Sequence, residues 1–206
     1  MIYKYSMLEY YATLDIPAVP QSIVDTAAVE IPIPRYSKFT FRLKFCNHSA
    51  ELSAIYSRVE LDQTCINWII KCVPELANEK CTFGYQVIDA VPGTSGKFVP
   101  HTDGLFRGTF VLSYLLDPGS DQPVTTHWWQ EHNCDKHRLP HTFITDYQKL
   151  HELTAVTIPV HQWHMLDASI LHSVHGIKTR RTAITVGFNN KEAVDVMLSK
   201  YRFKVI

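Results

Sequence analysis

The stretch LHSVHGIKTRRTAITVGF, residues 171–188, decides the expected fold. Residues 181–188 alternate between small or charged and bulky side chains, which is the period of an extended strand. One face carries Arg181, Ala183, Thr185 and Gly187, and the other carries Thr182, Ile184, Val186 and Phe188. The bulky face belongs against a core or a helix layer, whereas the first face leaves space for a small dianion beside a single cation. Residues 176–179 are typical of a hairpin turn, which predicts antiparallel pairing of the flanking strands with His172 across from Arg181.

Short strand-like runs extend outward from this stretch and fill most of the chain after Lys80. Turn residues separate them at Pro92-Gly93, Asp117-Pro118-Gly119 and Gly176. The predicted strands are 82–91, 97–101, 108–116, 124–129, 153–159, 169–174 and 181–188. Many short strands preceded by helices predict a mainly β fold with flanking helices, in which the core is a double-stranded β-helix of the jelly-roll or cupin-like kind.

Helices are predicted on both sides of this β region, within a single domain of 206 residues. Asp62 is a good N-cap for a helix that ends before Pro74, and weaker patterns place short helices near residues 21–28 and 192–200. We therefore expect a helical and irregular support at 1–80, a double-stranded β-helix core at 81–190, and a C-terminal helix and tail at 191–206.

Composition excludes some classes of protein. The formal net charge is zero, which argues against a duplex nucleic-acid binder because phosphate neutralisation dominates such binding. No apolar run is long enough for a membrane span, and five cysteines without a CxxC pair indicate reduced thiols. These features predict a soluble, cytoplasmic protein and do not indicate an oligomeric state.

The pair His101 and Asp103 is the first candidate metal site. In an extended chain residues i and i+2 point to the same side, so an imidazole and a carboxylate can converge on one ion. A second histidine, His172, completes a set of two imidazoles and one carboxylate, which is typical of non-haem Fe(II) oxygenases.

Residues 91–116, VPGTSGKFVPHTDGLFRGTFVLSYLL, resemble the prolyl-hydroxylase branch of the Fe(II)- and 2-oxoglutarate-dependent oxygenases. That branch has a Pro-Gly turn before H-x-D, an Arg shortly after it, and a strand that bears a Tyr. The spacing of nine residues from His172 to Arg181 is similar to the family's second motif. The resemblance covers residues 85–188, and Val91 departs from it because many prolyl hydroxylases have a Tyr there.

The resemblance implies a dioxygenase that hydroxylates a substrate and releases succinate and CO2, with Fe(II), 2-oxoglutarate and O2 as cofactor and cosubstrates. It implies His101, Asp103 and His172 as iron ligands and Arg181 as the anchor of the 2-oxoglutarate carboxylate. It also places Tyr114 beside that carboxylate and Arg107 at the substrate entrance. Trp129 and the insertion at 130–147 are further candidates for substrate binding.

Several of these residues have alternative interpretations. His175 is the rival to His172 and Arg180 the rival to Arg181, and in each case the rival lies on the opposite face of its strand. Tyr114 and Trp129 also fit plain core packing, and Asp103 fits a turn before Gly104. His161 and His164 precede a predicted strand and fit structural or solvent-exposed positions.

Two other classes of protein fit parts of the sequence. One is a non-catalytic cupin-like binding protein, and the other is a jelly-roll zinc enzyme with three protein ligands and a bound water. The intact ligand set and Arg181 argue against the binding protein, and the zinc enzyme gives no reason for the pair Arg181 and Tyr114. The expected substrate is a peptidyl residue, a free amino acid or another small metabolite.

Overall fold

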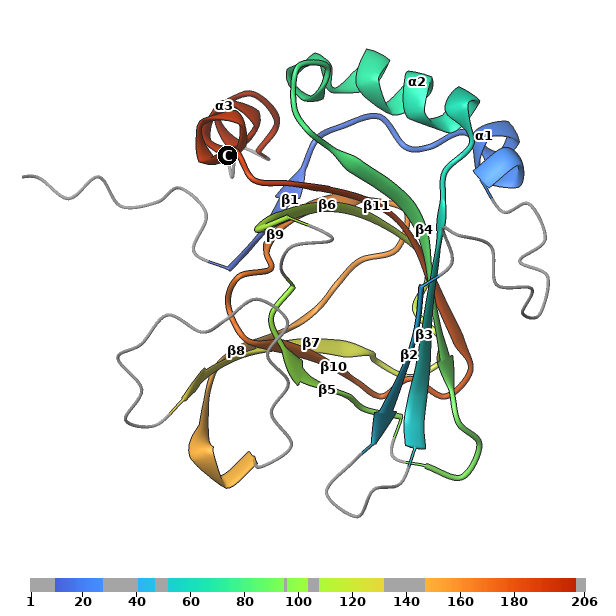
Figure 1. Ribbon diagram of the computed structural model, residues 1–206, viewed down its shortest axis with the longest axis vertical. Helices are drawn as coiled ribbons and strands as arrows, with labels where there is room; N and C mark the ends of the chain where they lie inside the picture. The colour runs from blue at the N-terminus through green and yellow to red at the C-terminus, as the bar shows by residue number, and fades with distance from the viewer. Residues whose placement is uncertain are drawn as a thin grey trace, which may run out of the picture.

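The computed structural model describes residues 10–27, 41–46, 52–94, 96–103, 108–131 and 147–202. Strands dominate this part of the chain, and three α-helices accompany them (Figure 1). In chain order the elements are β1 (Tyr11–Leu14), α1 (Gln21–Ala27), β2 (Phe41–Cys46), β3 (Leu52–Glu60), α2 (Gln63–Cys72), β4 (Thr82–Ala90), β5 (Phe98–His101), β6 (Phe110–Asp117), β7 (Thr125–Glu131), β8 (Leu150–Thr157), β9 (Trp163–Asp167), β10 (His172–His175), β11 (Arg180–Phe188) and α3 (Lys191–Tyr201), with short 3₁₀ turns at Pro74–Leu76 and Tyr147–Lys149.

The strands form two antiparallel sheets. The larger has seven strands in the order β1-β9-β6-β11-β4-β3-β2, and the smaller has four in the order β5-β10-β7-β8. From β4 onward the chain passes back and forth between them: β4, β6, β9 and β11 lie in the large sheet, and β5, β7, β8 and β10 in the small one. This winding is the double-stranded β-helix that the sequence predicts, so the prediction of the fold class is confirmed.

The predicted pairing of the last two strands is wrong. β10 pairs with β5 and β7, whereas β11 pairs with β4 and β6 in the other sheet. The link between them bonds to neighbouring loops instead of closing a hairpin: Ile177 N donates to Gly96 O at 3.1 Å, and Lys178 N donates to Gly119 O at 2.7 Å. The four-residue link therefore crosses between the sheets, and His172 and Arg181 come from opposite layers.

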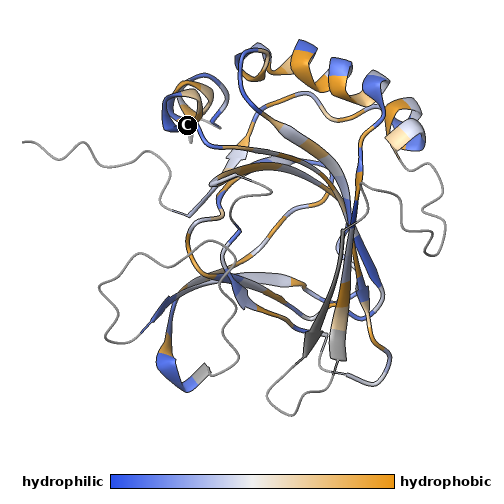
Figure 2. Ribbon diagram, viewed as in Figure 1, coloured by the Kyte–Doolittle hydropathy of each residue, from blue (hydrophilic) through white to orange (hydrophobic). Residues whose placement is uncertain are grey.

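One face of the large sheet is covered by helices. In Figure 1 all three α-helices lie on the side of this sheet away from the small sheet, and Figure 2 shows hydrophobic residues along the helix surfaces there. α2 begins after Asp62, whose side chain accepts from Thr64 N at 2.7 Å, and Asn190 caps α3 in the same way. The apolar sides of the helices supply Ile69, Val194 and Met197 to the core.

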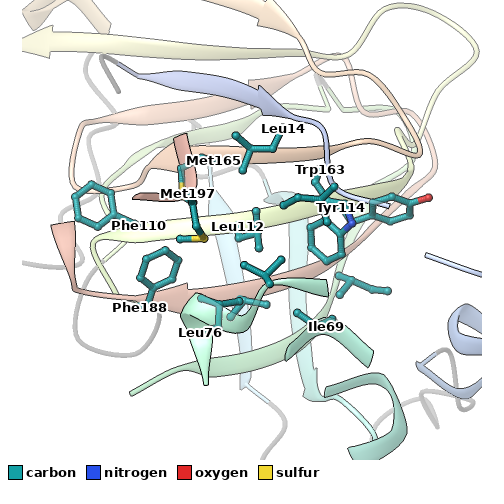
Figure 3. Packing of buried hydrophobic residues seen from close by; sticks show 14 of the residues in the cluster. Leu14, Ile69, Leu76, Phe110, Leu112, Tyr114, Trp163, Met165, Phe188 and Met197 are labelled. Carbon is teal, nitrogen blue, oxygen red and sulfur yellow. The ribbon is translucent and has the colours of Figure 1, made fainter. Parts of the chain in front are cut away.

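The core beneath the helices takes alternate residues from the strands, as Figure 3 shows for Leu112, Trp163, Met165 and Phe188. The bulky face of β11 lies here, as the alternation predicts. Each of these four side chains is at most 1% exposed, and full burial of a large apolar side chain contributes roughly 1.5–3 kcal/mol.

The N-terminal region differs from its prediction. The helices near residues 21–28 and after Asp62 are present as α1 and α2, but β1, β2 and β3 lie in the same region. β1 pairs with β9, and β3 pairs with β4 and with β2, so these strands extend the large sheet at both edges. In the described part of the chain, no helix is both long and apolar enough to cross a membrane.

Candidate metal centre and its pocket

Two histidines meet across neighbouring strands of the small sheet. His101 at the end of β5 lies directly opposite His172 at the start of β10, and their ring centroids are 4.4 Å apart. Asp103 follows two residues after His101, with its carboxylate 3.8 Å from His101 Nε2. One potential ligand atom from each of the three lies within 4.8 Å of the others. The structure therefore brings together the three residues that the sequence nominates as metal ligands.

Backbone carbonyl groups orient both imidazoles. His101 Nδ1 lies 2.8 Å from Val99 O, and His172 Nδ1 lies 2.9 Å from Ile170 O. A carbonyl oxygen only accepts, so each Nδ1 is the protonated nitrogen and each Nε2 carries the lone pair that a metal requires. This arrangement is typical of metal-binding histidines, whose second nitrogen donates to a carbonyl or carboxylate.

Asp103 lies beside these rings, and its side chain is only 10% exposed. Its backbone N–H donates to Ala168 O at 2.8 Å, which ties the end of β5 to the loop after β9. Burial raises the pKa of its carboxyl to about 7, and the positive charge of Arg58 opposes the rise. A cation bound between His101, Asp103 and His172 compensates a buried carboxylate, so the electrostatics of the site fit a divalent metal.

A single pocket between the two sheets connects this trio with Arg181 on β11. The small sheet contributes His101, His172 and Val174 to its lining, and the large sheet contributes Gln86, Ser113 and Ala183 beside Arg181. The predicted space beside the guanidinium therefore exists, because Ala183 is the next residue on the same face of β11.

Arg181 is a buried cation. It is only 9% exposed, and burial lowers the pKa of its guanidinium to about 10 while the charge of Asp117 opposes the change. It is still protonated at neutral pH. Among the described residues no carboxylate lies within ion-pair distance of it, so its charge and its donors are available to an anion in the pocket.

Arg180 occupies the opposite face of the strand. It is exposed and donates to Asp89 Oδ1 at 2.7 Å and to Oδ2 at 3.4 Å. The structure thus places Arg181 and not Arg180 in the pocket, as strand parity predicts.

Tyr114 does not lie in the pocket, and this part of the prediction is corrected. Val111 and Ser113 of β6 line the pocket, so Tyr114 points to the other face of the sheet. There its ring packs against Trp163 with centroids 5.1 Å apart, in the core under the helices (Figure 3). The alternation of β6 was visible in the sequence, but which face met the helices was not.

Trp129 also lies outside the pocket. It stacks on His127 at 5.7 Å between centroids, and its Nε1 donates to Ser173 Oγ at 2.8 Å. His175 belongs to the same outer group, with its ring centroid 4.2 Å from that of His127. Thr126, one residue before His127, lines the pocket, so His127 and Trp129 face away from it. His175 therefore does not belong to the metal trio, and Trp129 is not among the residues that line the pocket. Arg107 and residues 132–146 of the insertion lie outside the described residues.

Arg58 of β3 is a polar residue near the trio that the sequence did not nominate. It lies opposite Gln86 of β4, and its guanidinium covers Gly84, where any side chain would collide with it. Its Nη2 donates to Thr82 O at 3.1 Å, while its buried Nε has no hydrogen-bond partner. Asp103 is the carboxylate that most opposes the lowering of the Arg58 pKa by burial. No motif marks Arg58, because its position depends on β3 joining the sheet.

His164 of β9 was also missed. The sequence left it as a structural or solvent-exposed residue, and the structure buries it completely on the pocket side of the large sheet, whereas His161 is exposed. β9 was not predicted, so its alternation could not be assigned.

Comparisons with known proteins yield structural neighbours only. A scan against protein-family models finds no match, and neither does a search of the curated proteins. Among solved structures, the non-heme alpha ketoglutarate dependent carbocyclase SnoK from nogalamycin biosynthesis is 13% identical with a TM-score of 0.45, over 70% of this chain and 66% of that chain. The epimerase SnoN, in complex with Fe3+, alpha ketoglutarate and nogalamycin RO, is 11% identical with a TM-score of 0.47, and the match covers 88% of this chain and 82% of that chain. An oxidoreductase of the 2OG-Fe(II) oxygenase family from Burkholderia pseudomallei is 9% identical with a TM-score of 0.44, and the match covers 82% of this chain and 77% of that chain.

Proposed function

We propose that this chain is an Fe(II)- and 2-oxoglutarate-dependent oxygenase that hydroxylates a small-molecule or peptide substrate, with release of succinate and CO2. The observation that carries the proposal is one pocket that holds both a two-histidine, one-carboxylate trio and a buried arginine without a carboxylate partner among the described residues.

The donor set fits Fe(II). Two imidazoles and one carboxylate leave coordination positions open, which suits a metal that must also accept a chelating 2-oxo acid and O2. When bound, the iron and 2-oxoglutarate supply the oxidising chemistry, and the protein supplies binding, orientation and exclusion of water.

Different residues of the chain would bind the metal, bind the cosubstrate and exclude water. His101 and His172 present Nε2 because backbone carbonyls hold their Nδ1–H groups. Arg181 would offer a planar pair of donors to one carboxylate of a dianion whose other end would lie toward the trio in the same pocket. Phe98, Ile88 and Val174 give the pocket apolar walls that limit access of water.

The proposal includes hydroxylation and a prolyl-hydroxylase-like ancestry. The Pro92-Gly93 turn expected before H-x-D is formed: Thr94 N donates to Val91 O at 3.2 Å, and Gly93 has a φ of 79°. Asp103 supports hydroxylation because a carboxylate occupies the position that halogenases of this family leave vacant.

A reducing, cytoplasmic setting is proposed on the free thiols of Cys65, Cys72 and Cys81.

The test is succinate formation by protein loaded with Fe(II) without oxygen and then exposed to O2 and 2-oxoglutarate. Slow succinate release without added substrate is expected, and a screen of amino acids, peptides and small metabolites should contain compounds that accelerate it. His172→Ala should abolish release, whereas His175→Ala, on the outer face of the same strand, should retain it.

Three results would contradict the proposal in different ways. Metal binding without any succinate supports a cupin-like binding protein. Preference for Zn(II) with activity independent of 2-oxoglutarate supports a zinc enzyme. Loss of activity in His175→Ala with full activity in His172→Ala overturns the assignment of ligands.

A further inference from the structure

His164 is a buried histidine whose ring has no hydrogen bond. Its side chain is 0% exposed, and within the described structure neither Nδ1 nor Nε2 has a partner. A buried polar group without a partner is strongly unfavourable, and large apolar side chains would fill the same space without that penalty. A partner from outside the folded chain would remove that penalty.

The strand geometry places this ring on the pocket side of the large sheet. In β9, Trp163 and Met165 point to the helix-covered core, so His164 and Leu166 point the other way. Leu166 lines the pocket, and His164 lies directly across from Ser113 of β6, which lines it too. Two neighbours of His164 on this face thus belong to the pocket wall, whereas Thr13 of β1, directly across on its other side, does not.

Arg181 is the charged group that acts on His164. Burial, and to a smaller extent the positive charge of Arg181, together lower the pKa of the imidazole to about 3. The ring is consequently neutral at physiological pH, with one N–H to donate. Tyr11 also faces the ring, at 5.8 Å between centroids, but its hydroxyl is engaged with Thr13 Oγ1 at 2.7 Å.

Arg181 lines the arginine end of the pocket, and His164, which is fully enclosed and is not itself among the lining residues, lies close enough for the charge of Arg181 to act on it. Neither side chain has a hydrogen-bond partner among the described residues, one being a cation and the other a neutral donor. We infer that His164 donates a hydrogen bond to the distal carboxylate of 2-oxoglutarate, beside the paired donors of Arg181. The inference rests on the proposed function, and it supplies the second carboxylate-binding residue that Tyr114 does not provide.

The experiment compares two ligands that differ only in that carboxylate. Binding of 2-oxoglutarate and of 2-oxopentanoate is measured by titration calorimetry on Mn(II)-loaded full-length protein, without turnover, for wild type, His164→Leu and His164→Gln. His164→Leu should weaken 2-oxoglutarate binding about 10- to 100-fold, the range for losing one hydrogen bond to a charged group, and change 2-oxopentanoate binding less than about twofold. His164→Gln, which keeps an N–H donor, should recover part of the loss.

Met165→Ala is the matched control, because it damages packing on the other face of the same strand and should leave both affinities unchanged. If His164→Leu does not fold, His164→Phe takes its place, because phenylalanine keeps a ring of similar shape but has no N–H donor. Equal losses for the two ligands, or no loss for either, overturn the inference while the proposed function stands. Wild-type protein that binds Mn(II) but not 2-oxoglutarate overturns both.

Discussion

The two faces of the large sheet differ in whether their buried polar side chains have hydrogen-bond partners. On the helix-covered face, Trp163 Nε1 donates to Pro17 O at 3.0 Å, and the Tyr114 hydroxyl bonds the backbone of Val19. On the pocket face, both nitrogens of His164 and Nε of Arg58 lack partners. The two ring groups on the first face find backbone partners within the fold, whereas the second face holds three buried nitrogen atoms without a hydrogen-bond partner in the described structure.

β11 carries both roles in alternate residues. Ile184 and Val186 are 0% exposed in the helix-side core, while Arg181 and Ala183 line the pocket. Because neighbouring residues on this strand belong to different faces, single substitutions separate the energetics of folding from those of ligand binding.

The largest effect is expected from removing the pocket cation. Arg181→Ala should weaken 2-oxoglutarate binding by about 100- to 1,000-fold, because a buried carboxylate loses two charge-assisted hydrogen bonds and its counter-ion. The measurement is titration of 2-oxoglutarate into Mn(II)-loaded protein. Arg180→Ala is the control: it removes only a surface ion pair, worth about 0.2–1 kcal/mol, and should leave this affinity unchanged. The reverse pattern would mean that the wrong arginine has been assigned to the cosubstrate.

The next effect concerns stability without metal. The carboxyl of Asp103 has a pKa of about 7 in the fold, against 3.8 ordinarily, so between these values the folded protein holds a proton that the unfolded chain releases. The free energy of unfolding of metal-free wild type should therefore fall as pH rises from about 4 to 7, by roughly 2–4 kcal/mol. Asp103→Asn should lose this dependence and unfold at a higher temperature than wild type at pH 8.

Thermal unfolding at pH 5 and pH 8, with and without Mn(II), measures both parts of this prediction. Mn(II) should raise the unfolding temperature of wild type at pH 8 and leave Asp103→Asn unchanged, since the variant lacks the anionic ligand. A wild-type curve that rises between pH 5 and pH 7 relative to the variant would contradict the raised pKa.

Much of the fold was predictable because its signals are local. The alternation of residues 181–188, the N-cap Asp62 and the Pro-Gly turn each act within a few residues, and the structure confirms all three. Four strands were missed, namely β1, β2, β3 and β9. Some of them are short, and others depend for their place in the sheet on a partner strand far away in the chain. The crossover from β10 to β11 was missed for a similar reason, since loops around Gly96 and Gly119 hold it in place.

The candidate site likewise contains residues that a local sequence signal identifies and residues that only the assembled fold brings into place. Strand parity and the family resemblance together nominated His101, Asp103, His172 and Arg181, and these four residues line one pocket. Tyr114 was misplaced because the resemblance put it beside the carboxylate, and alternation alone does not say which face of its strand meets the helices. His164 and Arg58 have no sequence signal, because only the assembled sheet brings β9 and β3 beside the pocket.

The smallest effect tests the division between the two faces of β11 directly. Ile184→Val removes one methylene from the core, which should cost about 0.5–1.5 kcal/mol and lower the unfolding temperature by a few degrees without changing the affinity for 2-oxoglutarate. Ala183→Val, at the adjacent position, adds two methyl groups to the pocket beside Arg181 and should weaken that affinity at least several-fold. Unfolding temperature and calorimetric affinity are measured for both variants. If Ile184→Val weakens 2-oxoglutarate binding as much as Ala183→Val does, the helix-side core and the pocket are energetically coupled through the strand, and the separation of roles between the two faces is wrong.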